Sequence, residues 1–303
     1  MPRMFKSRWN RFVAVAAALP LAACAAQRAP TAEAAAAKPA MWRVADDDTA
    51  VYLFGTFHLL PENFQWRTQA FERALAAADE LVLEVANVGD QVAAAQAMMK
   101  LGISPGLPTL AQRVPEDKRA ALEAMAAESE VPMAVLDRLE TWAAALALTG
   151  ALFKRLGISG EAGVEKGLST GYAKTGKPIR GLETTEQQLG FFDGLPEEAQ
   201  RQFLLGVLER PEDTRAEFKA MLDAWRRGDE AAIARTFDDE AKLSPDLRRV
   251  LLTQRNERWA EWIDGRMDRP GTVMVAVGAG HLAGSDSVQK MLKKRGIAAK
   301  RVQ

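Results

Sequence analysis

The chain has 303 residues and carries 40 Lys and Arg side chains against 40 Asp and Glu, so its formal net charge is zero. This balance leaves no basic excess and argues against nucleic acid as a partner. The single cysteine excludes an internal disulfide bond. A chain of this length can nevertheless bury a core without one, in one large or two small domains.

Residues 1–23 have the parts of a secretory signal peptide, a basic start followed by an apolar run at residues 12–21. The apolar run is shorter than the ~20 residues that a membrane-spanning helix needs. The sequence Leu21-Ala22-Ala23-Cys24 that follows resembles the lipobox of bacterial lipoproteins, in which the cysteine becomes the lipidated first residue. The alternative is an ordinary secretory signal with a chance cysteine. The basic residues of the start are Arg3, Lys6, Arg8 and Arg11.

Cleavage before Cys24 would remove four basic residues and no acidic ones, which leaves a net charge of −4. Ala25, in place of Asp, favours the outer membrane over retention at the inner membrane. We therefore expect the membrane as a partner through a lipid anchor, in the bacterial cell envelope and facing the periplasm. Residues 24–40 are rich in alanine without an apolar period, and they predict a flexible tether from the lipidated cysteine.

The folded domain is predicted over residues 41–303. Residues 40–44 and 51–57 predict a β-hairpin with an acidic turn, and a helix from about residue 66 precedes a strand at residues 81–85. Residues 91–153 are rich in alanine and predict three helices, with breaks at residues 104–106, at Pro115 and at Pro132.

A glycine-containing loop at residues 157–163 leads to a helix that ends near residue 175, and a short strand follows at residues 178–181. Thr184 with Gln187, or Thr185 with Gln188, predicts a capping box for the next helix. Residues 196–264 are again helical, and a strand at 273–277, a helix at 285–295 and a strand at 297–302 close the chain. This order predicts an α/β fold, a central mixed β-sheet with helices packed around it and helical insertions that pack on it or form a cap.

The two histidines of the chain occur in similar local sequences. Val51–His58 and Val273–His281 are both apolar runs that end in Gly-x-x-His. Such runs predict buried strands, and a glycine after a strand lets the backbone turn or approach a ligand closely. Each histidine would then lie at the carboxyl end of a strand, which is where ligands bind in open α/β sheets.

Two carboxylates also occur at predicted strand ends. Glu84 interrupts the apolar strand at residues 81–85, and a buried carboxylate needs a cation, a donor or a metal. Alternatively, Glu84 faces solvent from an edge strand, although Val82 on the same face argues that this face is covered. Glu183 ends the short strand after Pro178, where it is either a site residue or an acid at a helix N-terminus.

Arg255 is the one cation in an apolar stripe of the helix that begins at Pro245. Either its long side chain reaches solvent, or Arg255 and Asn256 point into the site and meet a carboxylate or an anionic substrate group. The stripe consists of Leu247, Leu251, Arg255, Trp259 and Ile263.

Imidazoles and carboxylates at strand ends would suit a divalent metal such as Zn, Mn or Co, with room for an activated water. The spacing does not establish such a site, because the chain has no His-Glu-x-x-His or Cys-x-x-Cys sequence and a strand-end histidine is often only hydrogen-bonded.

The chain resembles the TraB/GumN family and is distantly similar to the Tiki metalloproteases. The resemblance covers residues 41 to 300, and the chain departs from it at Glu165, where family members often have Asp. This departure leaves a strict role for residue 165 in doubt. The matching pieces are Leu53–His58, Leu83–Val85, Gly163–Glu165, Gly176–Pro178, Gly181–Thr184 with Gln187, Arg255-Asn256 with Trp259, and Val277–Leu282 with Gly284.

The resemblance implies metal-dependent proteolysis, with His58, His281 and Glu84 as ligands of Mn, Co or Zn. Glu84 or Glu183 would take a proton from a metal-bound water, and Arg255 would steady the oxyanion or a substrate carboxylate.

The leading functional hypothesis is a lipid-anchored periplasmic metal-dependent hydrolase, with a peptidase as its narrower form. One alternative is a non-catalytic lipoprotein that binds a peptide or a small signal molecule in the same pocket. Another is an accessory factor for polysaccharide export. The sequence does not identify the substrate, the metal or the oligomeric state.

Overall fold

The computed structural model describes residues 37–303, except residues 159, 210–213 and 242–244. The predicted signal peptide, Cys24 and most of the predicted tether lie outside the described residues. Residues 37–40, predicted as the end of that tether, instead pack on the domain, where Ala37 is buried and the Lys38 N–H donates to the Arg226 carbonyl over 2.7 Å. In the described part of the chain, no helix combines the length and apolar character that a membrane span requires.

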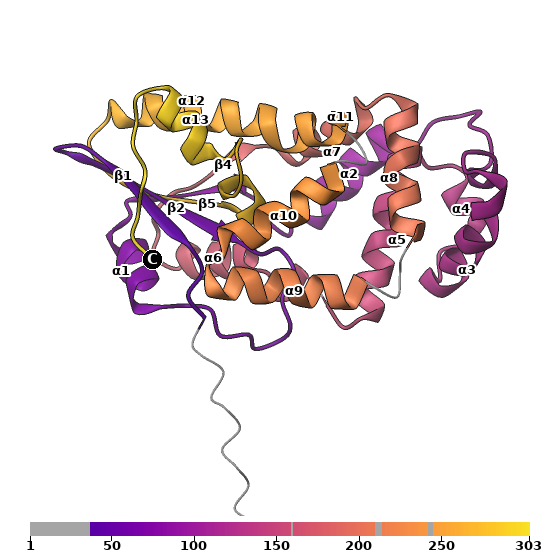
Figure 1. Cartoon of the computed structure of the whole chain (residues 1–303), viewed down its shortest axis with the longest axis horizontal. Helices are drawn as coiled ribbons and strands as arrows, with labels where there is room; N and C mark the ends of the chain where they lie inside the picture. Colours follow the sequence, from indigo (N-terminus) through magenta and orange to yellow (C-terminus); the bar gives the residue numbers. More distant parts are fainter. Residues whose placement is uncertain (1–36, 159, 210–213, 242–244) are drawn as a thin grey trace, which may run out of the picture. The chain divides into compact units, whose positions relative to one another are not determined.

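Within the described residues, six strands form one mixed sheet in the order β4-β3-β5-β2-β1-β6 (Figure 1). The four strands from β4 to β2 run parallel, whereas β1 is antiparallel to both of its neighbours. The predicted α/β class with a central mixed sheet is therefore confirmed. The strands are β1 (Met41–Ala45), β2 (Thr49–Thr56), β3 (Glu80–Val85), β4 (Ile179–Glu183), β5 (Gly271–Gly278) and β6 (Lys300–Arg301).

Helices cover both faces of this sheet, as Figure 1 shows. One face packs against α1 (Gln69–Ala77), α6 (Val164–Ala173) and α9 (Thr214–Arg227), in a core that includes Leu81 and Leu83 of β3. The other face packs against α12 (Gln254–Met267) and α13 (Val288–Lys294), in a core that includes Val82. The alternation along β3 thus sends successive side chains into two different cores.

The helical insertions have a third core of their own. It joins α3 (Arg119–Ser129), α5 (Thr141–Arg155) and α8 (Glu197–Glu209) through buried leucines such as Leu122, Leu148 and Leu204. The predicted helical block at residues 196–264 is therefore divided, because α8 joins this insertion core while α9 and α12 cover the sheet. The remaining helices are α2 (Gln91–Leu101), α4 (Met133–Leu136), α7 (Thr185–Asp193), α10 (Glu230–Ala241) and α11 (Pro245–Arg248).

Several predicted boundaries differ from the structure. Helix α1 begins at Gln69 rather than near residue 66, because the Thr68 hydroxyl accepts the Phe71 N–H and caps the helix. Residues 91–153 contain the additional single-turn helix α4, which follows Pro132. The last strand is shortened to two residues that pair only with β1 at the edge of the sheet.

Candidate functional site

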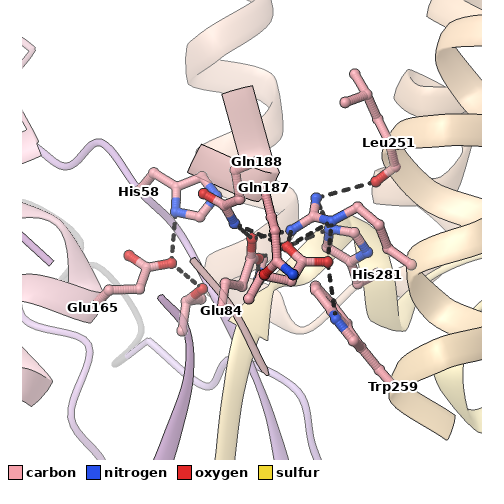
Figure 2. A network of polar contacts seen from close by, with 12 residues as sticks. His58, Glu84, Glu165, Gln187, Gln188, Leu251, Trp259 and His281 are labelled. Carbon is pink, nitrogen blue, oxygen red and sulfur yellow. Dashed lines mark hydrogen bonds and ion pairs between the residues drawn. The ribbon is translucent and has the colours of Figure 1, made fainter. Parts of the chain in front are cut away.

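The carboxyl ends of the parallel strands bring three predicted site residues around one glycine. A methyl group built on Gly278 would lie 3.2 Å from Glu84 Oε1, 3.3 Å from His58 Nε2 and 3.6 Å from His281 Cδ2. Figure 2 shows His58 and His281 on opposite sides of Glu84. Glycine at position 278 therefore leaves a small space that is bordered by two imidazoles and a carboxylate. This space is the centre of the candidate site.

Glu165 anchors the His58 ring. Its Oε1 lies 2.6 Å from His58 Nδ1 and also accepts the Thr56 hydroxyl. The negative charge of Glu165 raises the pKa of His58 to about 9, although the side chain is 62% exposed and water screens part of the attraction. The role of Glu165, in doubt from the sequence, is here a direct contact with a site histidine.

Gly163 lets the loop before α6 close over the end of β2. Its own Cβ, if it had one, would lie 2.1 Å from the His58 carbonyl oxygen, and the next N–H, of Val164, donates to the Phe57 carbonyl over 3.1 Å. This close contact places Glu165, in the first turn of α6, beside the His58 ring.

Replacing Gly163 with alanine should lower the free energy of unfolding by about 2 kcal/mol or more, because the added methyl group meets the backbone. The matched control is Gly167→Ala in the same helix, where an added Cβ has open space and should stabilise by about 0.5–1 kcal/mol. Urea unfolding of both variants measures the difference. Equal stabilities would contradict the close contact with His58.

His281 is held by an amide rather than by a carboxylate. Its Nδ1 lies 2.7 Å from Asn256 Oδ1, and the Asn256 amide nitrogen donates to the Asp286 carbonyl over 2.8 Å. Because that amide oxygen only accepts, we assign the proton of the neutral ring to Nδ1. The ring is 6% exposed, and burial lowers the pKa of His281 to about 3. Asn256 is therefore a positioning residue.

Glu84 lies between the two histidines on an interior strand, so the alternative of a solvent-facing edge residue is wrong. The residue is 7% exposed, and its Oε1 accepts the Gly278 N–H over 2.7 Å. Burial alone would raise the pKa of Glu84. The opposing influence of His281 and Arg255, together with the Gly278 N–H, holds that pKa well below its usual range.

Arg255 points into the site and not to solvent. Nη2 donates to Glu84 Oε2 over 2.6 Å and to Glu183 Oε2 over 2.8 Å, and Nε donates to both Glu183 oxygens. Nη1 donates to the Leu251 carbonyl and to His281 Nε2, each over 3.1 Å. All five N–H groups of the guanidinium thus have protein partners. Arg255 fixes other side chains in place, and the expected direct contact with an oxyanion has no free donor in this arrangement.

Glu183 ends β4, which β3 separates from β5 and Gly278 in the sheet. Its carboxylate accepts the Trp259 indole N–H over 3.2 Å, and Gln188 Nε2 bridges it to Glu84 over 3.2 and 3.0 Å. Gln188 belongs to α7, which begins with the predicted Thr184–Gln187 capping box. The expectation that Glu183 acts as a base has less support than the same role for Glu84, because Glu183 is not among the three nearest groups to the space over Gly278 and its oxygens accept from Arg255 and Trp259.

A π-helical turn, Arg249–Thr253, precedes Arg255 and was not foreseen from the sequence. In this turn the Gln254 N–H donates to the Arg249 carbonyl, one residue further back than in an α-helix. The apolar stripe from residue 247 to 263 contains no glycine or proline that would indicate the extra residue. The turn shifts the residues before it relative to α12, whereas Arg255, Trp259 and Ile263 share one face within α12 itself.

The described residues do not fit a divalent metal as they are placed. Among them, no group of three or more His, Cys, Asp and Glu side chains is arranged to hold an ion. The Arg255 guanidinium also donates to His281 Nε2, the ring atom that a metal would need, and to Glu84 Oε2. The metal expected from the resemblance stays a prediction.

Comparisons with known proteins give a family and two relatives. The sequence model of the TraB/PrgY/gumN family matches residues 40–301. The protein named "Uncharacterized protein YbaP" in Escherichia coli (strain K12) is 26% identical over 194 residues, which is 62% of this chain and 70% of the relative. The protein of the same name in Shigella flexneri matches to the same extent. No solved structure matches the chain significantly.

Proposed function

The chain belongs to the TraB/PrgY/gumN family, and from that premise we propose that it is a lipid-anchored hydrolase of the bacterial cell envelope that cleaves peptide or similar acyl bonds. The observation that carries the proposal is the convergence of His58, Glu84 and His281 on the space over Gly278. Lipid anchoring is supported by Cys24 in its Leu-Ala-Ala-Cys sequence. The substrate would then be a periplasmic peptide or small molecule.

The proposed hydrolysis uses only side chains of this protein and a water molecule. Glu84 Oε1 borders the space and would take a proton from a water molecule there, while the water oxygen attacks the carbonyl carbon. His58, held as an imidazolium by Glu165, would give its proton to the leaving nitrogen as the carbon–nitrogen bond breaks. A proton then passes from Glu84 to His58 and restores both groups. Arg255 and Asn256 keep Glu84 and His281 in position.

A peptide-library digest tests the proposal. The full-length protein is purified from bacterial membranes in detergent, and the mass of the mature chain shows whether it begins at a lipidated Cys24. His58→Gln should lower the cleavage rate at least about 100-fold, the lower end of the effect of a general acid. Gln65→Ala, an exposed change in the loop after β2, is the matched control and should cleave like the parent.

Two results of the digest would overturn the proposal. Undiminished cleavage by His58→Gln would remove His58 from the chemistry. Loss of cleavage in a chelator, with recovery on adding Mn, Co or Zn, would replace the metal-free step with the metal-dependent one that the resemblance implies.

The hydrogen bonds of Arg255 favour a second function, ligand binding without catalysis. All of its N–H groups donate to partners within the protein. Such a network could hold a pocket in shape without chemistry. The function would then be to sequester a peptide or a small signal molecule. Depletion of library peptides without products, unaffected by His58→Gln and by a chelator, would support binding over hydrolysis.

A further inference from the structure

A cavity of about 550 Å³ lies beside the candidate site. Its walls are the end of β3 with the residues that follow, one side of α2, and the junction between β4 and α7. The volume is in the range of pockets that hold small ligands, which is roughly 300–1,000 Å³. Of the predicted site residues, Glu183 lines this cavity, and α2 belongs to the predicted helical block at residues 91–153.

The cavity and the reacting groups share one wall. Glu183 lines the cavity on one side and accepts hydrogen bonds from Arg255 on the other. Val85, also in the lining, directly follows Glu84 on β3. The cavity wall thus adjoins Glu84 along β3 and Arg255 through Glu183.

The charged residues that line the cavity are already paired. Lys100 of α2 lies 2.5 Å from Glu186 of α7 across the rim, and Glu183 is neutralised by Arg255 at 2.8 Å. The Lys100–Glu186 pair is exposed and contributes little to stability, but its two opposite charges cancel at the rim. Binding a charged group would require an unpaired opposite charge. The lining thus favours an uncharged occupant.

Small side chains set the volume of the cavity. Ala93 and Ala97 lie four residues apart on α2, so they share one face of the helix, and both line the cavity together with Val85 and Ala86. A longer side chain at either alanine would extend into the space. We propose that this cavity is the subsite for an uncharged side chain of the substrate, next to the scissile bond, and that Ala93 and Ala97 set its size. This proposal rests on the proposed hydrolase function.

A matched pair of variants on α2 tests the subsite. Ala93→Leu fills the cavity, whereas Ala95→Leu adds the same side chain on the exposed side of the same helix, outside the lining. In the library digest, Ala93→Leu should lower cleavage next to leucine and phenylalanine at least 10-fold relative to cleavage next to alanine. Ala95→Leu should keep the profile of the parent, and circular dichroism confirms that both variants are folded.

A binding measurement separates this proposal from the hydrolase proposal. Saturation-transfer NMR uses N-acetyl-L-leucinamide as the uncharged probe and N-acetyl-L-lysinamide as its charged counterpart. N-acetyl-L-leucinamide should bind the parent and Ala95→Leu with similar affinity, and it should bind Ala93→Leu at least 5-fold more weakly. This result without any cleavage of the library would defeat the hydrolase proposal and leave the cavity as a binding site for an uncharged side chain. Equal binding to both variants, no binding to the parent, or a preference for lysinamide would overturn the subsite.

Discussion

Replacing Arg255 with methionine should lower the free energy of unfolding by about 3–5 kcal/mol, because two buried carboxylates then lose their shared cation. Glu84 and Glu183 are both buried, and Nη2 of Arg255 donates to each of them. Methionine keeps much of the length and apolar contact of the side chain but none of its charge. Urea unfolding followed by circular dichroism measures the loss.

The control for this prediction lies one turn away on the same helix. Arg258 is 49% exposed and 3.7 Å from Glu183, so Arg258→Met should cost less than about 1 kcal/mol. A rescue separates charge from packing: adding Glu84→Gln and Glu183→Gln to Arg255→Met removes the uncompensated charges and should recover most of the lost stability. If Arg255→Met costs no more than Arg258→Met, the three groups are not a buried ion network.

The strands that carry the site follow from local sequence. The apolar runs before Gly55 and Gly278 predict β2 and β5, and the apolar pattern around Glu84 predicts β3. Parallel strands have their carboxyl ends at one edge of a sheet, so the pattern also predicts that the residues after them lie close together. Those predictions need only the period of side chains along a strand and the glycines that end it.

The partners of the site residues could not be predicted in the same way. Glu165 lies in a helix more than a hundred residues beyond His58, and nothing in its local pattern distinguishes it from other acids in a first helical turn. The helical period places Arg255 in an apolar stripe, and a contact with a carboxylate was one of the two alternatives that this position allowed. Which carboxylates it meets could not be predicted, because Glu84, Glu183 and His281 lie on other elements far away in the sequence.

The two histidines should titrate on opposite sides of neutrality, although each ends a Gly-x-x-His sequence. His58 faces Glu165 and, more distantly, Glu84 and Arg255, and its pKa is raised to about 9. His281 is buried against Asn256 and Arg255, and its pKa is lowered to about 3. The chain has no other histidine, so a long-range proton–nitrogen NMR spectrum contains two imidazoles, which His281→Gln assigns. Two titrations near pH 6.5 would contradict the proposed division of roles between the rings.

The opposite pKa shifts of His58 and His281 also predict how the stability of the protein depends on pH. The raised pKa of His58 contributes stability that is fully present below the unfolded value of about 6.5 and is lost as pH rises through about 9. The lowered pKa of His281 contributes stability that is present above pH 6.5 and is lost as pH falls toward about 3. These two groups together therefore place a maximum of stability near pH 6.5, measurable by urea unfolding across the pH range. Glu165→Gln should remove the pH dependence of stability only on the alkaline side of that maximum, because the neutral amide cannot hold the proton on His58. If the pH dependence weakened equally on both sides, the two histidines would not titrate independently of each other.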